Sequence, residues 1–190
     1  MTGDRSPVAG LLLTPGAGAG RDHHTLVAVE EAVAPLPVRR VDFPYRLAGR
    51  RMPDRPAVAV AHLAEEAHRF AEELGVATER LVLGGRSYGG RMCSMAVADI
   101  LPAAGLALLS YPLHPPGKPS SLRVDHFGDL HVPVLFVSGD RDPFGSPEEL
   151  EQHSAAIRGP VTTVLLPGAH DVKGRDLEVG VAVRTWIAGL

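Results

Sequence analysis

The sequence has little cysteine, little lysine and no long apolar run, the features typical of disulfide-rich, nucleic-acid-binding and membrane proteins respectively. Its 190 residues include one cysteine, Cys93, so no internal disulfide can form, and a cytoplasmic location is the expectation. Lysine occurs only at positions 118 and 173, and a net charge of −3 gives no sign of a nucleic-acid-binding surface. No apolar run is long enough to span a membrane. These absences favour a globular protein that binds a small molecule.

The composition that remains suits a single domain over residues 1–190. Hydrophobic residues make up 45% of the chain and charged residues 22%, which is ordinary for a folded domain with one sizeable core. The apolar run 8–13 leads into a glycine-rich turn without a cleavage site. We therefore expect a buried strand there and no signal peptide. The sequence leaves the oligomeric state open.

Short apolar runs alternate with segments of helical periodicity along the whole chain. The candidate strands are 8–13, 38–42, 81–83, 106–109, 134–137 and 161–166. The candidate helices are 23–34, 56–74, 87–100, 147–157 and 176–187. Such alternation predicts a mainly parallel sheet of about six strands with both faces covered by helices, a three-layer α/β sandwich.

Two long loops, 43–55 and 111–125, are rich in proline, glycine and arginine. Each follows a strand, so both are predicted at the carboxyl edge of the sheet, where folds of this type bind ligands. The segment between the fourth and fifth strands is too short for a cap domain. We therefore expect an open site.

The segment Gly85-Arg86-Ser87-Tyr88-Gly89 joins a predicted strand directly to a predicted helix. A G-x-S-x-G sequence in that position is typical of a nucleophile elbow, in which a sharp turn exposes the serine above the sheet. The crowded backbone tolerates only small residues two positions before and after the serine. The sequence thus indicates Ser87 as a catalytic nucleophile.

A serine nucleophile needs a base and an acid that orients the base, in the chain order Ser, Asp, His on this fold. His170 follows the sixth strand in a glycine-containing turn, and is the candidate base. Asp140 and Asp142 both follow the fifth strand. Asp142 is the favoured acid because it lies further beyond the strand, whereas Asp140 has an alternative role in binding backbone N–H groups of its turn.

Two backbone N–H groups are expected to form the oxyanion hole. One is that of Tyr88, directly after the nucleophile, and the other belongs to the turn after the first strand, where Ala17 is favoured over Gly16. Further candidates for substrate contact are Arg86 in the elbow, Tyr45 and Arg46 in the first long loop, and His114 in the second. No spacing of histidines, cysteines or acids indicates a metal site, and no cofactor is expected.

The same glycine-rich turn permits a competing interpretation. Gly16, Gly18 and Gly20 follow an apolar strand and Asp42 ends the next, as in a dinucleotide-binding unit. Against that interpretation, the spacing is one residue shorter than G-x-G-x-x-G. It also leaves Ser87, Asp142 and His170 without a role.

With these motifs in place, the chain resembles the small bacterial α/β-hydrolases without a cap that are related to dienelactone hydrolases. Eukaryotic relatives of that group include a testis-expressed hydrolase-like protein and a subunit of a histone acetyltransferase complex. The resemblance lies in segments 13–18, 42–45, 49–51, 84–90, 111–119, 139–143 and 168–170. It implies the α/β-hydrolase fold and a triad of Ser87, Asp142 and His170. The chain departs from the family in having Pro15 where histidine is usual, and from dienelactone hydrolases in having serine where they use a cysteine nucleophile.

The sequence therefore predicts a serine hydrolase that acts on a small ester or thioester through an acyl-enzyme. The alternative is a catalytically inactive domain of the same fold that serves in protein interaction. A complete set of serine, acid and histidine at the proper strand ends favours the enzyme.

Overall fold

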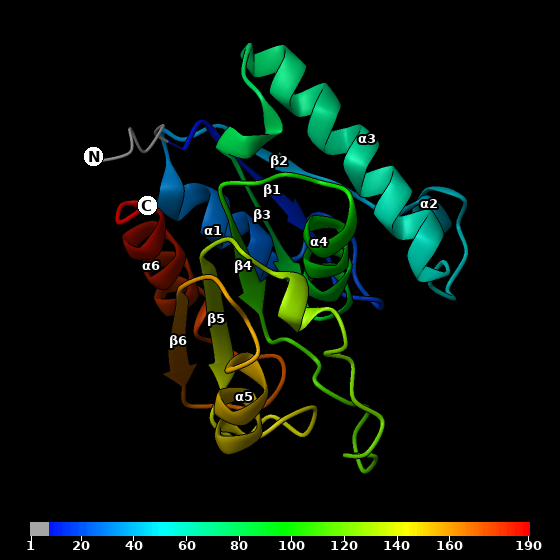
Figure 1. Cartoon of the computed structure of the whole chain (residues 1–190), viewed down its shortest axis with the longest axis vertical. Coiled ribbons are helices and arrows are strands. Elements are labelled where there is room, and N and C mark those ends of the chain that lie inside the picture. The colour runs from blue at the N-terminus through cyan, green and yellow to red at the C-terminus, as the bar shows by residue number, and fades with distance from the viewer. Residues whose placement is uncertain (1–7) are drawn as a thin grey trace.

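Six parallel strands form the centre of the molecule in a computed structural model that describes residues 8–190 (Figure 1). Residues 1–7, where the sequence analysis expected no signal peptide, lie outside the described residues. The strands are β1 (Gly10–Thr14), β2 (Val38–Arg40), β3 (Leu81–Arg86), β4 (Gly105–Leu109), β5 (Val134–Gly139) and β6 (Val161–Leu166). Their order in the sheet is β2-β1-β3-β4-β5-β6, with every neighbouring pair parallel.

Helices cover both faces of this sheet (Figure 1). They are α1 (His24–Val33), α2 (Pro44–Leu47), α3 (Pro56–Leu74), α4 (Tyr88–Asp99), α5 (Pro147–Ser154) and α6 (Asp176–Ile187). Helices α1 and α6 pack on one face, and α3 and α4 on the other. Local signals set their ends: α3 starts at Pro56 and stops at Gly75, whose φ of 67° few other residues would adopt. The predicted three-layer α/β fold is confirmed.

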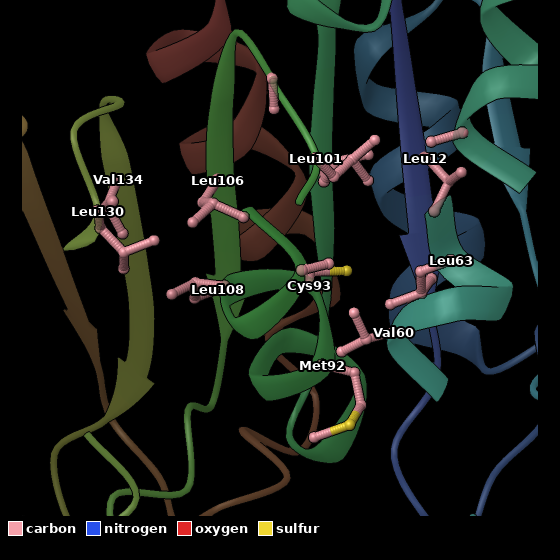
Figure 2. Close-up of a cluster of buried hydrophobic side chains, with 14 of the residues drawn as sticks. Leu12, Val60, Leu63, Met92, Cys93, Leu101, Leu106, Leu108, Leu130 and Val134 are labelled. Carbon is pink, nitrogen blue, oxygen red and sulfur yellow. The ribbon is translucent and has the colours of Figure 1, made fainter. Parts of the chain in front are cut away.

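The alternation of side chains along each strand divides the core into two layers. In β4, for example, Leu106 and Leu108 face α3 and α4, whereas Ala107 and Leu109 face α1 and α6. Figure 2 shows part of the first layer, where Cys93 of α4 lies among leucine side chains of the strands. The sheet is therefore buried on both sides over most of its width.

The edge strands are the exceptions: no residue of β2 is fully buried, and the expectation of two covered faces is wrong for β6. None of its six residues is fully buried, and Leu165 is 44% exposed. The reason is position: β6 pairs only with β5 and lies at the edge of the sheet. Thr162 and Thr163, which interrupt the apolar residues of β6, are both exposed and are the local sign of this position.

The first long loop contains an element that the sequence did not indicate. Pro44 to Leu47 form the single-turn helix α2, and Tyr45 within it is fully buried. Four residues are too few for a helical period to be recognised. The second loop is irregular, as predicted, until a 3₁₀ turn at Phe127–Asp129, and no cap domain lies between β4 and β5.

The strand order places a crevice at the carboxyl edge. The chain adds β2 on one side of β1 and β3 to β6 on the other, so the direction of winding reverses between β1 and β3. Loops that leave the two strands at such a point diverge and open a binding crevice. Among residues 8–190, no helix has the length and apolar character needed to cross a membrane.

Candidate active site

Ser87 occupies a strained turn between β3 and α4. Its φ of 51° and ψ of −115° are unusual for a residue with a side chain. The turn is so crowded that a Cβ on Gly85 would lie 2.7 Å from the Thr14 carbonyl oxygen, and one on Gly89 would lie 2.6 Å from the Pro15 carbonyl oxygen. These contacts explain why glycine is needed on both sides of the serine, as expected for a nucleophile elbow.

The structure brings Ser87, His170 and Asp142 into one hydrogen-bonded row. Ser87 Oγ lies 2.8 Å from His170 Nε2, and His170 Nδ1 lies 2.7 Å from Asp142 Oδ2. Because an ionised carboxylate can only accept, the imidazole proton belongs on Nδ1 and Nε2 is left to accept from the Ser87 hydroxyl. In this tautomer the row is oriented for proton transfer from serine to histidine.

Two further residues hold His170 in place. Arg86 donates from Nη2 to the His170 carbonyl oxygen at 3.2 Å. The Phe144 ring stacks on the imidazole, with ring centroids 4.0 Å apart and planes 27° apart. The sequence analysis did not identify Phe144, although its place two residues after Asp142 could have suggested it.

The two acids after β5 have different surroundings. Asp142 is buried; its Oδ1 accepts from the Phe144 N–H at 2.8 Å while its Oδ2 faces His170. Asp140 is exposed and accepts from the Gly168 N–H at 2.9 Å. This hydrogen bond is the main reason why the pKa of Asp140 lies below its ordinary value. Asp140 thus links the loop after β5 to the loop after β6 and does not contact the histidine.

The two predicted oxyanion donors lie on the same cavity as Ser87. Tyr88 is the first residue of α4, where backbone N–H groups have no partner within the helix. Ala17 belongs to the loop after β1, and its carbonyl oxygen accepts from the Tyr45 hydroxyl at 2.7 Å. Asp54 links Tyr45 to Tyr88: its carboxylate accepts a hydrogen bond from the Tyr45 N–H, and its carbonyl oxygen accepts one from the Tyr88 hydroxyl. Residues of the 43–55 loop therefore contact both the Ala17 carbonyl group and the Tyr88 side chain.

The cavity beside Ser87 has a volume of about 410 Å³. It is lined by the elbow, the first turn of α4 and the loops after β1, β2, β4, β5 and β6. Of the candidate substrate contacts, Arg86 lines it. Tyr45 is buried behind the Ala17 loop, Arg46 is exposed, and His114 is buried against Glu149 of α5. The structure does not bring these three side chains to the cavity.

Two arginines that the sequence analysis did not single out also line the cavity. Arg91 is one helical turn after Ser87 on α4, and Arg123 lies in the loop after β4. No acidic side chain lines the cavity. The site therefore combines a hydroxyl, an imidazole and three guanidinium groups, Arg86 included.

Cys93 and Asp42 have structural surroundings. The Cys93 thiol is fully buried, donates to the Gly84 carbonyl oxygen, and has its pKa raised to about 12 by burial, so it cannot act as a thiolate nucleophile. Asp42, the residue that a dinucleotide site would use, accepts from the Arg21 N–H at 2.8 Å. Across residues 8–190, no group of three or more histidines, cysteines or acids is arranged to hold a metal ion.

We expect acid to destabilise the fold through His126. Burial, and secondarily the charge of Arg91, lowers the pKa of His126 to about 4 from 6.5. Between these two pH values the unfolded chain binds a proton that the folded protein excludes, so stability falls as the pH decreases through this range. The His126→Gln variant should lose less unfolding free energy between pH 7 and pH 4.5, measured by urea denaturation. The control is the His68→Gln variant, which removes an exposed histidine and should lose as much unfolding free energy as the wild type over this pH range. An equal loss of unfolding free energy in the wild type and in His126→Gln would contradict the prediction.

Comparisons with known proteins agree with this architecture. Est1E from Butyrivibrio proteoclasticus, solved with ferulic acid, superposes with a TM-score of 0.74 at 17% identity, covering 98% of this chain and 91% of its own. The RedJ thioesterase of the prodiginine biosynthetic pathway in Streptomyces coelicolor superposes with a TM-score of 0.70 at 16% identity, covering 97% of this chain and 87% of its own. A predicted dienelactone hydrolase from Klebsiella pneumoniae superposes with a TM-score of 0.71 at 18% identity, covering 97% of this chain and 88% of its own. At these identities the likeness shows the fold.

A family model adds a match at the level of sequence. The model describes an alpha/beta hydrolase domain and matches residues 7–182, nearly the whole chain. This extent confirms the resemblance drawn from the motifs. The protein is therefore a member of the alpha/beta hydrolase domain family.

Proposed function

We propose that the protein is a serine hydrolase that cleaves a small ester or thioester through an acyl-enzyme. The observation that carries the proposal is the continuous row of Ser87 Oγ, His170 Nε2, His170 Nδ1 and Asp142 Oδ2 at a strained strand-to-helix turn. Such a row is the arrangement that converts a weakly nucleophilic hydroxyl into an effective nucleophile at neutral pH.

In the proposed reaction, Ser87 Oγ attacks the acyl carbon while its proton passes to His170 Nε2. The Tyr88 and Ala17 N–H groups stabilise the oxyanion that forms. His170 then gives the proton to the leaving alcohol or thiol as the acyl bond breaks. Water next attacks the acyl-enzyme, loses its proton to His170, and releases the carboxylic acid and the free Ser87 hydroxyl. Asp142 stabilises the imidazolium in both halves.

The open cavity supports a small substrate. It has a volume of about 410 Å³, and its rim consists of loops with no cap domain above them. A cavity of this size lies at the lower end of the range for small-molecule sites. The side chains of Phe144, Pro53 and Pro112 provide apolar contact for a short acyl chain.

A fluorophosphonate probe tests the proposal directly. The phosphorus accepts an attacking activated serine with loss of fluoride, so we expect a single adduct on the intact protein by mass spectrometry. Neither the Ser87→Ala variant nor heat-unfolded wild-type protein should form it. Labelling that persists in the Ser87→Ala variant would contradict the nucleophile assignment. Absence of labelling in the folded wild type would contradict catalysis and favour the non-catalytic alternative.

A further inference from the structure

Arg91 and Arg123 are half-buried cations without a carboxylate partner in the described part of the chain. The buried Nε of Arg91 also has no hydrogen-bond acceptor there. Six other arginines, at positions 39, 40, 50, 69, 141 and 175, each form an ion pair with an acid. An unpaired guanidinium that is partly removed from water is costly. Two such guanidinium groups line the cavity beside Ser87, which suggests that a bound anion balances their charge.

The two arginines lie close enough to act on each other. Burial, and next the charge of Arg91, lowers the pKa of Arg123 below its ordinary value. Burial raises the pKa of Tyr111, the Ser94 hydrogen bond and the charges of both arginines counter part of that rise, and the charge of Asp125 adds to it. Two guanidinium groups therefore lie on the side of the cavity formed by α4 and the loop after β4, and Asp125, the acid nearest to Arg123 in the chain, is not among the residues that line the cavity.

The backbones that carry these side chains are firmly held. The Arg123 N–H donates to the Leu113 carbonyl oxygen at 2.8 Å, and the Arg123 carbonyl oxygen accepts from the Tyr111 hydroxyl at 2.7 Å. Arg91 is in the first turn of α4, where its N–H donates to the Ser87 carbonyl oxygen at 3.0 Å. A binding group on a rigid backbone loses little entropy when its ligand arrives.

Arg86 belongs to the same cavity but has another task. Its Nη2 donates to the His170 carbonyl oxygen, so it positions the base. Burial lowers the pKa of Arg86, and its charge adds to the positive field around Ser87. We therefore assign anion contact to Arg91 and Arg123 and treat Arg86 as a positioning residue.

We propose that Arg91 and Arg123 bind an anionic group of the substrate, a carboxylate or a phosphate, while Ser87 attacks its ester or thioester carbonyl. The inference rests on the proposed function, because it assigns one end of the substrate to the serine. Guanidinium groups bind carboxylates and phosphates through paired, charge-assisted hydrogen bonds. Arg91 follows Ser87 by one helical turn and both line one cavity of about 410 Å³. A short dicarboxylic acid half-ester carries an acyl carbon and an anionic group within one small molecule and is therefore the substrate type to test.

The experiment compares p-nitrophenyl hydrogen glutarate with p-nitrophenyl pentanoate, which has the same chain length without the charge. After subtraction of spontaneous hydrolysis, we expect kcat/KM of the wild type to be roughly 10- to 100-fold higher for the glutarate ester. Mainly by raising KM for the glutarate ester, Arg91→Gln and Arg123→Gln should each abolish most of this preference. Arg91→Lys, which keeps the charge, should retain part of it.

Arg184→Gln is the matched control, because it removes an exposed arginine from α6 on the opposite face of the sheet. The preference should be unchanged in that variant. Butyrate and inorganic phosphate are then compared as inhibitors of pentanoate ester hydrolysis, and the stronger inhibitor identifies the anion that the site prefers. That anion should inhibit the Arg91→Gln variant less than it inhibits the wild type. Thermal unfolding confirms that each variant is folded.

The outcomes separate the two proposals. Ser87-dependent hydrolysis of both esters at equal rates, or a preference that survives in Arg91→Gln and Arg123→Gln, would overturn the anion site and leave the hydrolase assignment intact. If neither ester is cleaved, calorimetric titration with glutarate and with phosphate still tests the site. Binding that is lost in Arg91→Gln would support it, and no binding at millimolar concentration would overturn it.

Discussion

The Ser87→Ala variant is expected to lose about 10⁴- to 10⁶-fold of the wild-type kcat toward short p-nitrophenyl esters. The hydroxyl is the atom that bonds to the acyl carbon, and His170 Nε2, 2.8 Å away, has no other proton to take in the first step. Substrate binding and the oxyanion donors remain, so a small residual rate above water is expected. The measurement is release of p-nitrophenolate at pH 7.5, corrected for spontaneous hydrolysis.

Ser87→Gly is an informative companion to this variant. Glycine also removes the hydroxyl, but it relieves the φ of 51° that a residue with a Cβ adopts at a cost of roughly 1–2 kcal/mol. We expect the glycine variant to be as inactive as the alanine variant and to unfold at a higher temperature than wild type. Wild-type turnover in either folded variant would refute the assignment of Ser87.

The Asp142→Asn variant is expected to lose about 10⁴-fold in kcat while keeping the fold. An amide in place of the carboxylate no longer stabilises the imidazolium, and its NH₂ group can donate to Nδ1, which favours the tautomer with the proton on Nε2. That proton would face the Ser87 hydroxyl and remove the base. Steady-state kinetics on the neutral ester measure the effect.

Asp140→Asn is the control for the loss of a nearby negative charge. Asp140 is two residues from Asp142 on the same loop, but it is exposed and contacts the Gly168 N–H instead of His170. We expect this variant to keep kcat within a few-fold and to remain folded. If Asp140→Asn were the more damaging of the two, the assignment of the orienting acid would have to be exchanged.

Local signals explain what could be predicted of the site. The elbow glycines are dictated by backbone crowding at Ser87, so their spacing is visible in the sequence. Asp142 and His170 follow the ends of neighbouring parallel strands, and such ends meet at one edge of the sheet. Strand order therefore brings together residues that are far apart in the chain.

Other features depend on packing between segments and leave little local trace. Tyr45 was a candidate for substrate contact, yet it lies behind the Ala17 loop, because the single turn α2 buries its ring. The exposure of β6 follows from its place at the sheet edge, of which Thr162 and Thr163 are the only local sign in the strand. Phe144 stacks on His170 only because the loops after β5 and β6 run side by side.

The sequence by itself determined the fold class and the three residues of the proposed triad, because hydrophobic periodicity and strand-end motifs are properties of short segments. Only the tertiary structure decided the chemistry of the cavity wall. Arg91 and Arg123 come from different elements, and neither carries a local signal that separates it from the other arginines of the chain. Neither forms an ion pair with a carboxylate of residues 8–190, and ion pairs are set by the folded arrangement of the chain.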